Sequence, residues 1–520
     1  MARGATTEVD ERWQRLRHPP AWVWTGALLI LALGVRLAWL AYTGYVEEDA
    51  FITFRVARQL AAGNGFVYNL GQHVDGTTTP LFALLLAGWF RLSSDVVLGA
   101  RLLDLSAGLG TLLLVQQTLQ RLGRTAAEQA GALLLLALTS KMVNMETQGM
   151  ETPLVLFWMA AACYALVRGR AAWAGVLCGL LLWTRMDLFL WPLLLAAAAA
   201  LGERKAGVRL ALAAAGTFLP WVLFSTLYFG SPIPQTVTAK WVAYVQFDAS
   251  PLLNHLSPVL AYLTPLYTHQ ANAQRSLTVV LTLALAAAGA WLVRRQRLLW
   301  VLPAFAVLDL AQLVLTRATF FNRYFVPLQW TVLVLAGIAL GKLWERSRSL
   351  PAAARVGLPV VLLLALGAVV VSGLSQAADA RLQQTIRNQA SLTAIGVWLH
   401  QHAPPGATVE LEPLGYIGYY ADRTMLDEVG LVTPAVVALK LQRVPGYATF
   451  TYLDPDYLVL HCDDALRMQD PTRVEDIGLA NLYLPVREFN PLAFDPAHPR
   501  PDPYLETLSR NACYGIWQKK

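Results

Sequence analysis

Acidic and basic side chains gather in the polar segments between the apolar runs of this chain. The most acidic of these segments spans residues 47–80 and opens with three consecutive carboxylates, Glu47, Glu48 and Asp49. A carboxylate can take the proton of a hydroxyl group, and a lysine or arginine can neutralise a phosphate leaving group. These residue types therefore indicate chemistry in which a hydroxyl attacks a substrate that carries a phosphate.

The candidate residues recur at the ends of apolar runs, in segments that the charge pattern places on one side of a membrane. They are Glu47, Glu48, Asp49, Arg55, Arg58, His73, Asp75, Glu146, Glu151, Arg185, Asp187, Lys240 and Arg323. Ionisable groups are costly near the hydrocarbon, so their clustering on one side favours a shared site. For any one of them alone, a solvated loop residue is the simpler interpretation.

Four specific alternatives stay open for the residues that carry most weight. Asp49 can act only as a helix cap, because its side-chain oxygens can accept the free amides of the next turn. Lys240 and Arg323 can act as interfacial anchors. Asp187 can simply pair with Arg185, and Glu151 can cap the helix that follows it.

The segment after Asp49 has the pattern of a short amphipathic helix over 50–62. One flank carries an apolar residue at every fourth position, namely Ile52, Val56 and Leu60. The Gly-Asn-Gly sequence at 63–65 ends the helix, since these residues tolerate positive φ. A helix of this length is too short to span a bilayer, so we expect it to lie on the membrane surface.

The composition excludes an ordinary soluble enzyme. The chain has 520 residues, of which 56% are hydrophobic and 14% charged. Apolar runs of roughly 15 to 24 residues separated by short polar loops predict an α-helical polytopic membrane protein. Residues 376–520 hold 12 of the 41 basic residues and 17 of the 34 acidic ones, so the excess of positive charge lies before them. Cytoplasmic loops explain that excess, and no nucleic-acid partner is implied.

About eleven transmembrane helices are predicted. They lie at 22–42, 96–119, 126–143, 152–167, 171–184, 188–202, 208–228, 277–293, 298–315, 324–341 and 355–375. The apolar segment 79–90 is too short to cross, and we interpret it as a re-entrant or surface helix. If it did span, every later basic loop would change sides. Arg36 and Asp309 lie within predicted spans, where each either marks a polar interior or pairs with a neighbour.

The charge pattern also predicts orientation. Arg3, Arg12, Arg15 and Arg17 precede the first span and place the N-terminus in the cytoplasm. The first loop, 47–92, with its juxtamembrane helices, is then outside. The apolar pieces within 251–268 are expected at the interface of a long outside loop.

The chain divides into a membrane domain, 1–375, and a soluble domain, 376–520. With an odd number of spans the second domain is extracytoplasmic. Strand-like pieces at Thr408–Leu411, 457–460 and 514–517 indicate an α/β fold for this domain. The domain is also a candidate for carbohydrate binding. Cys462 and Cys513 can pair there if the compartment is oxidising, whereas Cys163 and Cys178 lie in apolar spans.

Several motifs together resemble the GT-C class of membrane glycosyltransferases, which use polyprenyl-phosphate sugars. The motifs are EDAFITFRVARQLAAGNGFVYNLGQHVDGTTTPL at 48–81, GMET at 149–152, TRMD at 184–187, PIPQTVTAK at 232–240, NRYFVPL at 322–328 and GYIGYYADRTMLDEVGL at 415–431. Within the class, the chain looks most like the branch that contains the mycobacterial terminal arabinofuranosyltransferase. The first motif is the most specific, and the resemblance spans nearly the whole chain.

The resemblance implies an inverting transfer of a sugar, with arabinofuranose the expected one, from a polyprenyl phosphate to a cell-surface glycan. It implies that Asp49 is the base and Glu48 supports it, although the family pattern is an Asp-Asp pair. Lys240, Arg323 and Arg185 would hold the donor phosphate. The expected substrate-binding residues are Arg55, His73, Asp75, Thr78, Glu151, Asp187 and Tyr324.

Departures from the family pattern affect the substrate assignment. His73 stands where the family commonly has Glu, Asp75 lies in a changed motif, and the segment from Arg185 to Asp187 lacks the usual proline. No spacing typical of a metal site is present. No cofactor is therefore assigned, and a divalent-metal requirement stays open.

Two other classes of function compete with an enzyme. A transporter or lipid-sugar flippase would show internal repeats and broken helices at the midplane, and neither is visible in the sequence. A non-catalytic subunit of glycan assembly would use the C-terminal domain as its working part. In every case the expected partners are membrane lipids and a glycan or lipid-linked sugar, and the expected place is the cell membrane.

Overall fold

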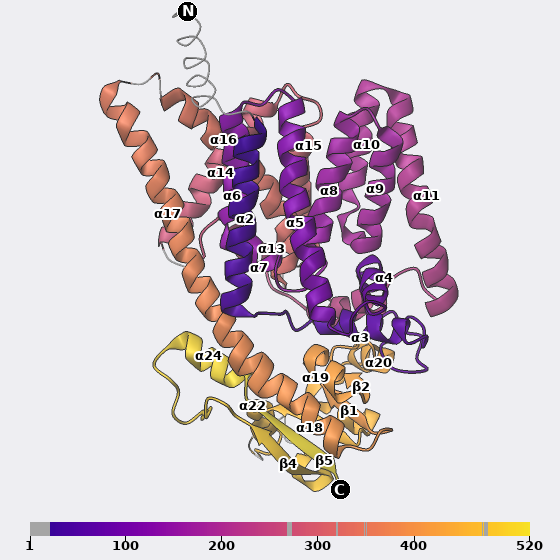
Figure 1. The fold of residues 1–520 in the computed structure, drawn as a ribbon. Coiled ribbons are helices and arrows are strands. Elements are labelled where there is room, and N and C mark those ends of the chain that lie inside the picture. The colour runs from indigo at the N-terminus through magenta and orange to yellow at the C-terminus, as the bar shows by residue number, and fades with distance from the viewer. Residues whose placement is uncertain are drawn as a thin grey trace, which may run out of the picture.

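The computed structural model describes residues 21–267, 273–318, 321–347, 349, 351–470, 472 and 477–520. A bundle of helices forms one layer, and a smaller domain of helices and a β-sheet lies against one end of it (Figure 1). The four N-terminal arginines on which the predicted cytoplasmic N-terminus rests lie outside the described residues.

A helix of the bundle lies at the position of each predicted span. These helices are α2 Ala21–Thr43, α5 Val96–Arg121, α6 Ala126–Leu138, α8 Thr152–Val167, α9 Ala171–Thr184, α10 Leu190–Gly202, α11 Arg204–Phe229, α14 Ala273–Val293, α15 Val301–Leu315, α16 Val326–Ser347 and α17 Ala352–Leu382. Among the described residues, six helices are long and apolar enough to cross a membrane, and the other predicted spans are shorter apolar helices. The chain is thus a multi-pass membrane protein, as predicted.

The predicted span 126–143 is not one helix. It breaks at Thr139 into α6 and the short α7, Ser140–Met145. The break places Lys141 where its amine donates hydrogen bonds of 3.1–3.2 Å to the carbonyls of Ala261, Tyr262 and Thr264. Those carbonyls belong to the end of α13, Leu252–Tyr262, and a buried lysine satisfies them as water would elsewhere.

The position expected for the 251–268 segment is therefore wrong in part. The C-terminal end of α13 enters the bundle, where Val259 and Leu263 are buried. The Tyr262 carbonyl also accepts a hydrogen bond of 2.7 Å from the side-chain amide of Gln329 of α16. Only the start of this segment keeps the exposure expected of an interfacial helix.

Two short helices cover the end of the bundle that faces the C-terminal domain. They are α3, Ala50–Ala61, and α4, Pro80–Trp89, and neither is long enough to span a bilayer. α3 packs between α4 and α19, Leu414–Ala421, so protein covers it on two sides, and the membrane-surface position expected for it stays a prediction. This packing explains why both the apolar stripe and part of the polar flank of α3 are buried.

The C-terminal domain contains a five-stranded sheet of order β2-β1-β3-β5-β4. The strands are β1 Thr408–Leu411, β2 Thr424–Asp427, β3 Tyr457–His461, β4 Tyr483–Phe489 and β5 Tyr514–Lys519. β1 pairs in parallel with β2 and β3, and β5 is antiparallel to β3 and β4. The helices of this domain are α18 Ala394–His402, α19, α20 Pro434–Leu441, α21 Phe450–Leu453, α22 Cys462–Arg467, α23 Leu479–Leu482 and α24 Pro503–Asn511.

One helical segment joins the two domains without a break. α17 continues through η4, Gln383–Thr393, into α18, so the predicted boundary at residue 376 falls inside it. Figure 1 shows this segment running diagonally from the far end of the bundle to the sheet. The connection gives the domains a fixed geometry rather than a loose linker.

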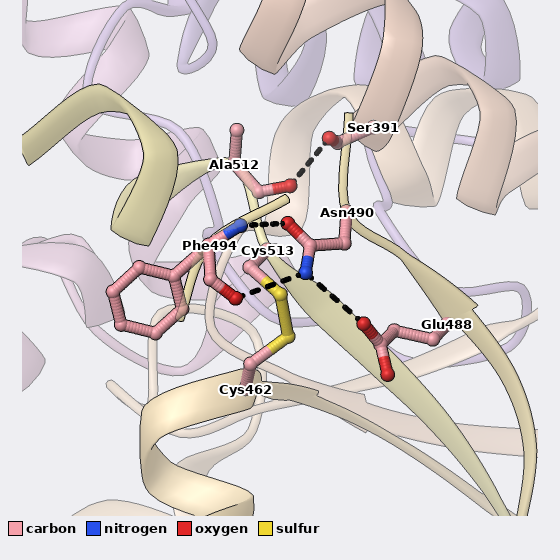
Figure 2. Close-up of a disulfide and its surroundings, with 7 residues drawn as sticks. All are labelled: Ser391, Cys462, Glu488, Asn490, Phe494, Ala512 and Cys513. Atoms are coloured by element: carbon pink, nitrogen blue, oxygen red, sulfur yellow. Dashed lines mark hydrogen bonds between the residues drawn. A yellow bond between two sulfur atoms is a disulfide. The ribbon is translucent and has the colours of Figure 1, made fainter. Parts of the chain in front are cut away.

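A disulfide joins Cys462, at the start of α22, to Cys513, just before β5 (Figure 2). Beside it, the Ser391 hydroxyl of η4 donates a hydrogen bond of 2.5 Å to the Ala512 carbonyl. Both links hold the segment between α24 and β5 against the rest of the domain. Cys163 and Cys178 are free and buried, as expected for packing residues.

Candidate active site

The two residues at the centre of the candidate site are Asp49, just before α3, and Arg323, in the short helix η3, Asn322–Phe325, before α16. Asp49 Oδ2 and Arg323 Nη2 form an ion pair of 2.5 Å. The Asp49 side chain makes no hydrogen bond that caps α3, so the capping role considered for it is not observed. It turns instead to a cation 274 residues later in the chain.

A second cation lies beside this pair. Lys240 ends α12, Gln235–Lys240, and its Nζ donates a hydrogen bond of 3.4 Å to the Tyr324 hydroxyl. Its amine also lies 5.0 Å from the centre of the Phe321 ring, and the Arg323 guanidinium lies 4.3 Å from the same centre. The aromatic residue thus places both cations side by side.

The two cations set the protonation state of Asp49. Burial raises the pKa of this carboxyl, but the charges of Arg323 and Lys240 outweigh burial and lower the pKa from its usual value. A side-chain hydrogen bond with Glu48 acts in the same direction. Asp49 is therefore ionised at neutral pH.

Its two acidic neighbours behave oppositely. Burial raises the pKa of Glu48 well above its usual value, and the negative charge of Asp49 adds to the effect. The same two causes raise the pKa of Glu47. Environment has separated three adjacent carboxyls into one ionised group and two that hold protons more tightly.

Arg185, between α9 and η1, Met186–Leu188, completes the cationic group. Its Nη1 donates a hydrogen bond of 3.1 Å to the Arg323 carbonyl. Its guanidinium carbon lies 5.0 Å from the centre of the Tyr324 ring. Arg185 also forms a two-point ion pair with Asp187, one bond of which, from Nε, is 3.1 Å. The pairing alternative considered for Asp187 is thus observed.

Glu151 does not cap α8, since no side-chain hydrogen bond reaches the first turn. Its carboxylate is buried near the cluster instead. Burial lowers the pKa of Arg323, and Asp49, Tyr324, Glu151 and Glu47 together reverse that effect and raise it. Segments from five parts of the chain therefore meet at one place: those holding Asp49, Glu151, Arg185, Lys240 and Arg323.

A polar cavity of about 330 Å³ lies beside the cluster, and we refer to it as the inner cavity. Its lining includes Tyr45, Glu47, Gln148, Arg323, Gln383 and Tyr504. The wall is thus shared between the membrane domain and the C-terminal domain. A substrate in it would touch both.

The structure does not bring Arg55 into this cluster. Its guanidinium is buried and donates hydrogen bonds to the carbonyls of Tyr68, Gly418 and Arg423 at 2.5–3.0 Å. Gly418 lies in the last turn of α19, where free carbonyls favour a cation. The substrate-binding role expected for Arg55 is therefore corrected to a structural one, in which it fastens α3 to the C-terminal domain.

His73, Asp75 and Thr78 also lie outside the cation cluster. His73 is exposed and stacks on Tyr228 of α11, with ring centres 4.3 Å apart. Asp75 is buried, and burial raises its pKa to about 7. The nearby Thr77 amide limits this rise, although neither oxygen of the Asp75 carboxylate has a hydrogen-bond partner of normal geometry among the described residues. Thr78 is half-buried, and its neighbours Thr77 and Thr79 form a cluster of hydrogen-bonded hydroxyls with Thr53.

The GMET motif has a packing role. Gly149 has a φ of +81°. A Cβ atom added at this position would lie 3.3 Å from the Phe54 side chain and 3.4 Å from the Val46 side chain. Its amide donates a hydrogen bond of 3.0 Å to Asp104 of α5. A side chain here would be strained and would push α3 away from the bundle.

Sequence reasoning missed Arg387 and Glu412 of the C-terminal domain. Burial lowers the pKa of Arg387, but Tyr514, Glu48 and Glu412 raise it overall. Arg387 also opposes the rise in the pKa of Glu48. No local pattern in the sequence distinguishes Arg387, because its partners come from distant segments.

No metal is assigned to the described part of the chain. Cys462, Glu488 and Cys513 do lie together, with potential ligand atoms within 4.8 Å of one another. However, the two sulfurs are bonded to each other, and the Glu488 carboxylate accepts a hydrogen bond of 3.2 Å from Asn490 (Figure 2). A disulfide supplies no thiolate ligand.

Comparisons with known sequences give distant matches. Residues 380–508 match the family described as a domain of unknown function, DUF8728. The terminal beta-(1->2)-arabinofuranosyltransferase of Mycobacterium tuberculosis is 29% identical over 240 residues, which are 41% of this chain. The match spans 38% of the length of that curated relative.

Comparisons with solved structures extend over most of the chain. ArnT from Cupriavidus metallidurans, bound to undecaprenyl phosphate, matches with a TM-score of 0.60 at 16% identity, covering 96% of this chain and 98% of ArnT. The oligosaccharyltransferase AglB from Archaeoglobus fulgidus, in complex with an inhibitory peptide and a dolichol-phosphate, matches with a TM-score of 0.61 at 11% identity. That match covers 91% of this chain and 73% of AglB. The chain is a multi-pass membrane protein with the GT-C fold that ArnT and AglB share.

Proposed function

We propose that this protein is an inverting glycosyltransferase that moves a sugar from a polyprenyl-phosphate donor to a glycan acceptor. The observation that carries the proposal is the ion pair between Asp49 and Arg323: the guanidinium lines the inner cavity, and the nearby charge of Lys240 helps to keep the carboxylate ionised. It places a base beside a site for an anion. The polyprenyl and dolichol phosphates bound to ArnT and AglB support this class of donor.

The proposed reaction is a single displacement. Asp49 takes the proton of an acceptor hydroxyl, whose oxygen bonds to the anomeric carbon as the bond from that carbon to the phosphate oxygen breaks. The phosphate leaves with the bonding electrons, and Arg323, Lys240 and Arg185 stabilise its charge. Glu48 supports Asp49, and Glu151, Asp187 and Tyr324 position the cations and the substrate.

Donor binding would also strengthen the base. Among the described residues, Asp49 is the carboxylate that forms an ion pair with Arg323. This pairing lowers the pKa of Asp49. A phosphate drawn to Arg323 and Lys240 would offset their charges, so the pKa of Asp49 would rise when donor is present. Proton abstraction would then be coupled to an occupied donor site.

This coupling gives a pH prediction. An ionised Asp49 is required, so activity is lost as pH falls through its pKa, and Arg323→Gln raises that pKa by removing the main opposing charge. We expect the acid limb of kcat/KM to move to higher pH by about one unit or more. The measurement is the pH profile of transfer between pH 3.5 and 8, with Arg58→Gln as control, because Arg58 pairs with Asp422 at the surface. An acid limb unchanged from wild type would contradict the assignment of Asp49 as the base.

We further propose that the site faces the outside of the cell, with arabinofuranose as the sugar and the cell-wall glycan as the acceptor. The disulfide is typical of oxidising compartments and supports this side for the C-terminal domain. The loops at the opposite end of the bundle contain the basic residues expected in the cytoplasm, such as Arg297, which donates to the Leu201 carbonyl. The sugar itself is suggested by the mycobacterial relative.

The proposal is tested by transfer in lipid nanodiscs. Purified protein is incubated with radiolabelled polyprenyl-phosphate arabinofuranose and an octyl arabinofuranoside, and the anomeric configuration of the product is read by NMR. We expect a product of inverted configuration. A protein that moves the donor across vesicles without glycosidic product would instead be the transporter, and one that binds glycan without either activity would be a non-catalytic subunit.

A further inference from the structure

A second polar cavity, of about 380 Å³, lies in the C-terminal domain, and we refer to it as the outer cavity. Its walls come from η4, from the ends of β1 and β3, and from α24. The lining includes Gln383, Arg387, Glu412, His461, Tyr504 and Thr507. None of them has a role in the reaction proposed above.

The position of the outer cavity in the sheet is one where ligands commonly bind. The chain passes from β1 to β2 on one side and then returns to β3 on the other side of β1. Glu412 directly follows β1, and His461 ends β3, so both lie at the carboxyl ends of adjacent parallel strands. In open α/β sheets, ligands bind outside the carboxyl ends of the strands where the order reverses.

The two cavities adjoin. Gln383 and Tyr504 line both the outer and the inner cavity, and the inner cavity reaches Arg323. The Tyr504 hydroxyl donates a hydrogen bond of 3.0 Å to the Asp379 carbonyl, which fixes α24 against α17. A ligand chain that occupies both cavities would therefore pass this shared wall on its way to Asp49.

The walls of the outer cavity are held from both sides. Cys462 of the disulfide directly follows His461 on one wall, and Cys513 comes two residues after Asn511 on the other. The bond from Ser391 to the Ala512 carbonyl ties η4 to the same place. These links keep the cavity formed without a ligand.

The chemistry of the lining selects the ligand. Arg387 supplies donors and Glu412 acceptors, and the amides of Gln383 and Asn511 supply both, which suits vicinal hydroxyl groups. Arg387 and Glu412 line the same cavity, so a cation and a carboxyl face the ligand together rather than a cluster of cations that would select an anion. Tyr504 and Leu508 add apolar surface of the kind that a sugar ring covers.

We propose that the outer cavity is a subsite for a neutral sugar unit of the acceptor glycan, several units away from the reacting hydroxyl. The inference rests on the proposed function and adds to it a means of selecting long acceptors. It assigns the C-terminal domain a role in acceptor binding, with the inner cavity as the path between subsite and base.

The test compares binding of an octyl arabinofuranoside with that of its linear tetrasaccharide, in nanodiscs without donor, by isothermal titration calorimetry. We expect wild type to bind the tetrasaccharide about tenfold more tightly, as two or three added hydrogen bonds would allow. Thr507→Trp fills the outer cavity, and Glu412→Gln removes its charged acceptor; each should reduce this ratio toward one. Thr385→Trp is the matched control, because Thr385 is exposed on η4 outside the lining and should keep the ratio.

Transfer to the two acceptors is measured in parallel, as the ratio of their kcat/KM values. A wild type without preference for the tetrasaccharide in binding, or a Thr507→Trp variant that keeps the preference, would overturn the subsite. Absence of transfer to either acceptor by wild type would overturn the proposed function instead, and the binding titration would still decide the subsite. Both variants are compared with Thr385→Trp for yield and elution in size-exclusion chromatography, so that misfolding is recognised.

Discussion

Asp49→Asn should lower kcat for sugar transfer by about 10²–10⁴-fold, the range typical of losing a general base. The asparagine keeps the size of the side chain but cannot take a proton. It also loses the ion pair with Arg323, so both cations become more available to the donor phosphate. We therefore expect polyprenyl-phosphate affinity to be retained or increased while the chemical step fails.

The measurement is the single-turnover rate with bound donor, together with the dissociation constant for polyprenyl phosphate. Asp422→Asn is the matched control, since Asp422 is half-exposed and forms its ion pair with Arg58 at the surface. A rate for Asp49→Asn within threefold of wild type would rule out Asp49 as the base. Equal losses of rate and donor affinity would indicate a structural role for it.

Glu146→Ala should destabilise the fold by about 3–5 kcal/mol, because it leaves a buried arginine without its counter-charge. Arg36 is fully buried in the middle of α2, and its Nε donates a hydrogen bond of 2.6 Å to Glu146 Oε2. Its Nη1 also donates to the carbonyls of Ala32 and Ala137, at 3.1 and 3.2 Å. Gly108 of α5 permits the close approach, since a built Cβ there would lie 2.8 Å from the same carboxylate oxygen.

The double variant Arg36→Met/Glu146→Leu separates the charge effect from the packing effect. Replacing both members of a buried pair by apolar residues of similar size is often neutral or stabilising. We expect its thermal unfolding in detergent to return close to wild type, and that of Glu146→Ala to occur well below it. Equal losses for the single and the double variant would show that packing, not the unpaired charge, dominates.

The membrane helices are the part of the fold that the sequence predicts best. The helices at Thr152–Val167 and Ala171–Thr184 begin and end as expected, since basic or polar residues interrupt the apolar runs there. The break at Thr139 was missed because Lys141 finds its partners on α13, more than 100 residues away. Such a contact leaves no trace in local hydropathy.

The soluble domain was predicted less completely. The strands β1, β3 and β5 were expected, but the edge strands β2 and β4 were missed. β4 contains Pro485 next to a register shift, a combination that edge strands tolerate and that weakens the strand pattern in the sequence. The burial of α3 was missed for a similar reason, since Arg55 reaches carbonyls on and after α19 that no periodicity reveals.

The sequence predicts which residues form the candidate site but not how they are arranged. Charge parity placed Asp49, Lys240, Arg185 and Arg323 on one side of the membrane, and the structure brings these four together. Charge parity could not separate these four residues from Arg55, because Arg55 lies in the same predicted outside segment as Asp49. Nor could it indicate Arg387 of the C-terminal domain, whose position depends on the long helical segment that ends in α18.

The roles of Asp49, Arg323 and Lys240 are best tested by a structure of the protein with polyprenyl phosphate in a lipid nanodisc, determined by electron cryomicroscopy. The phosphate should lie within hydrogen-bond distance of Arg323 and Lys240, with Asp49 released from Arg323 and facing the inner cavity. A phosphate bound away from both cations, with the pair between Asp49 and Arg323 intact, would contradict the account.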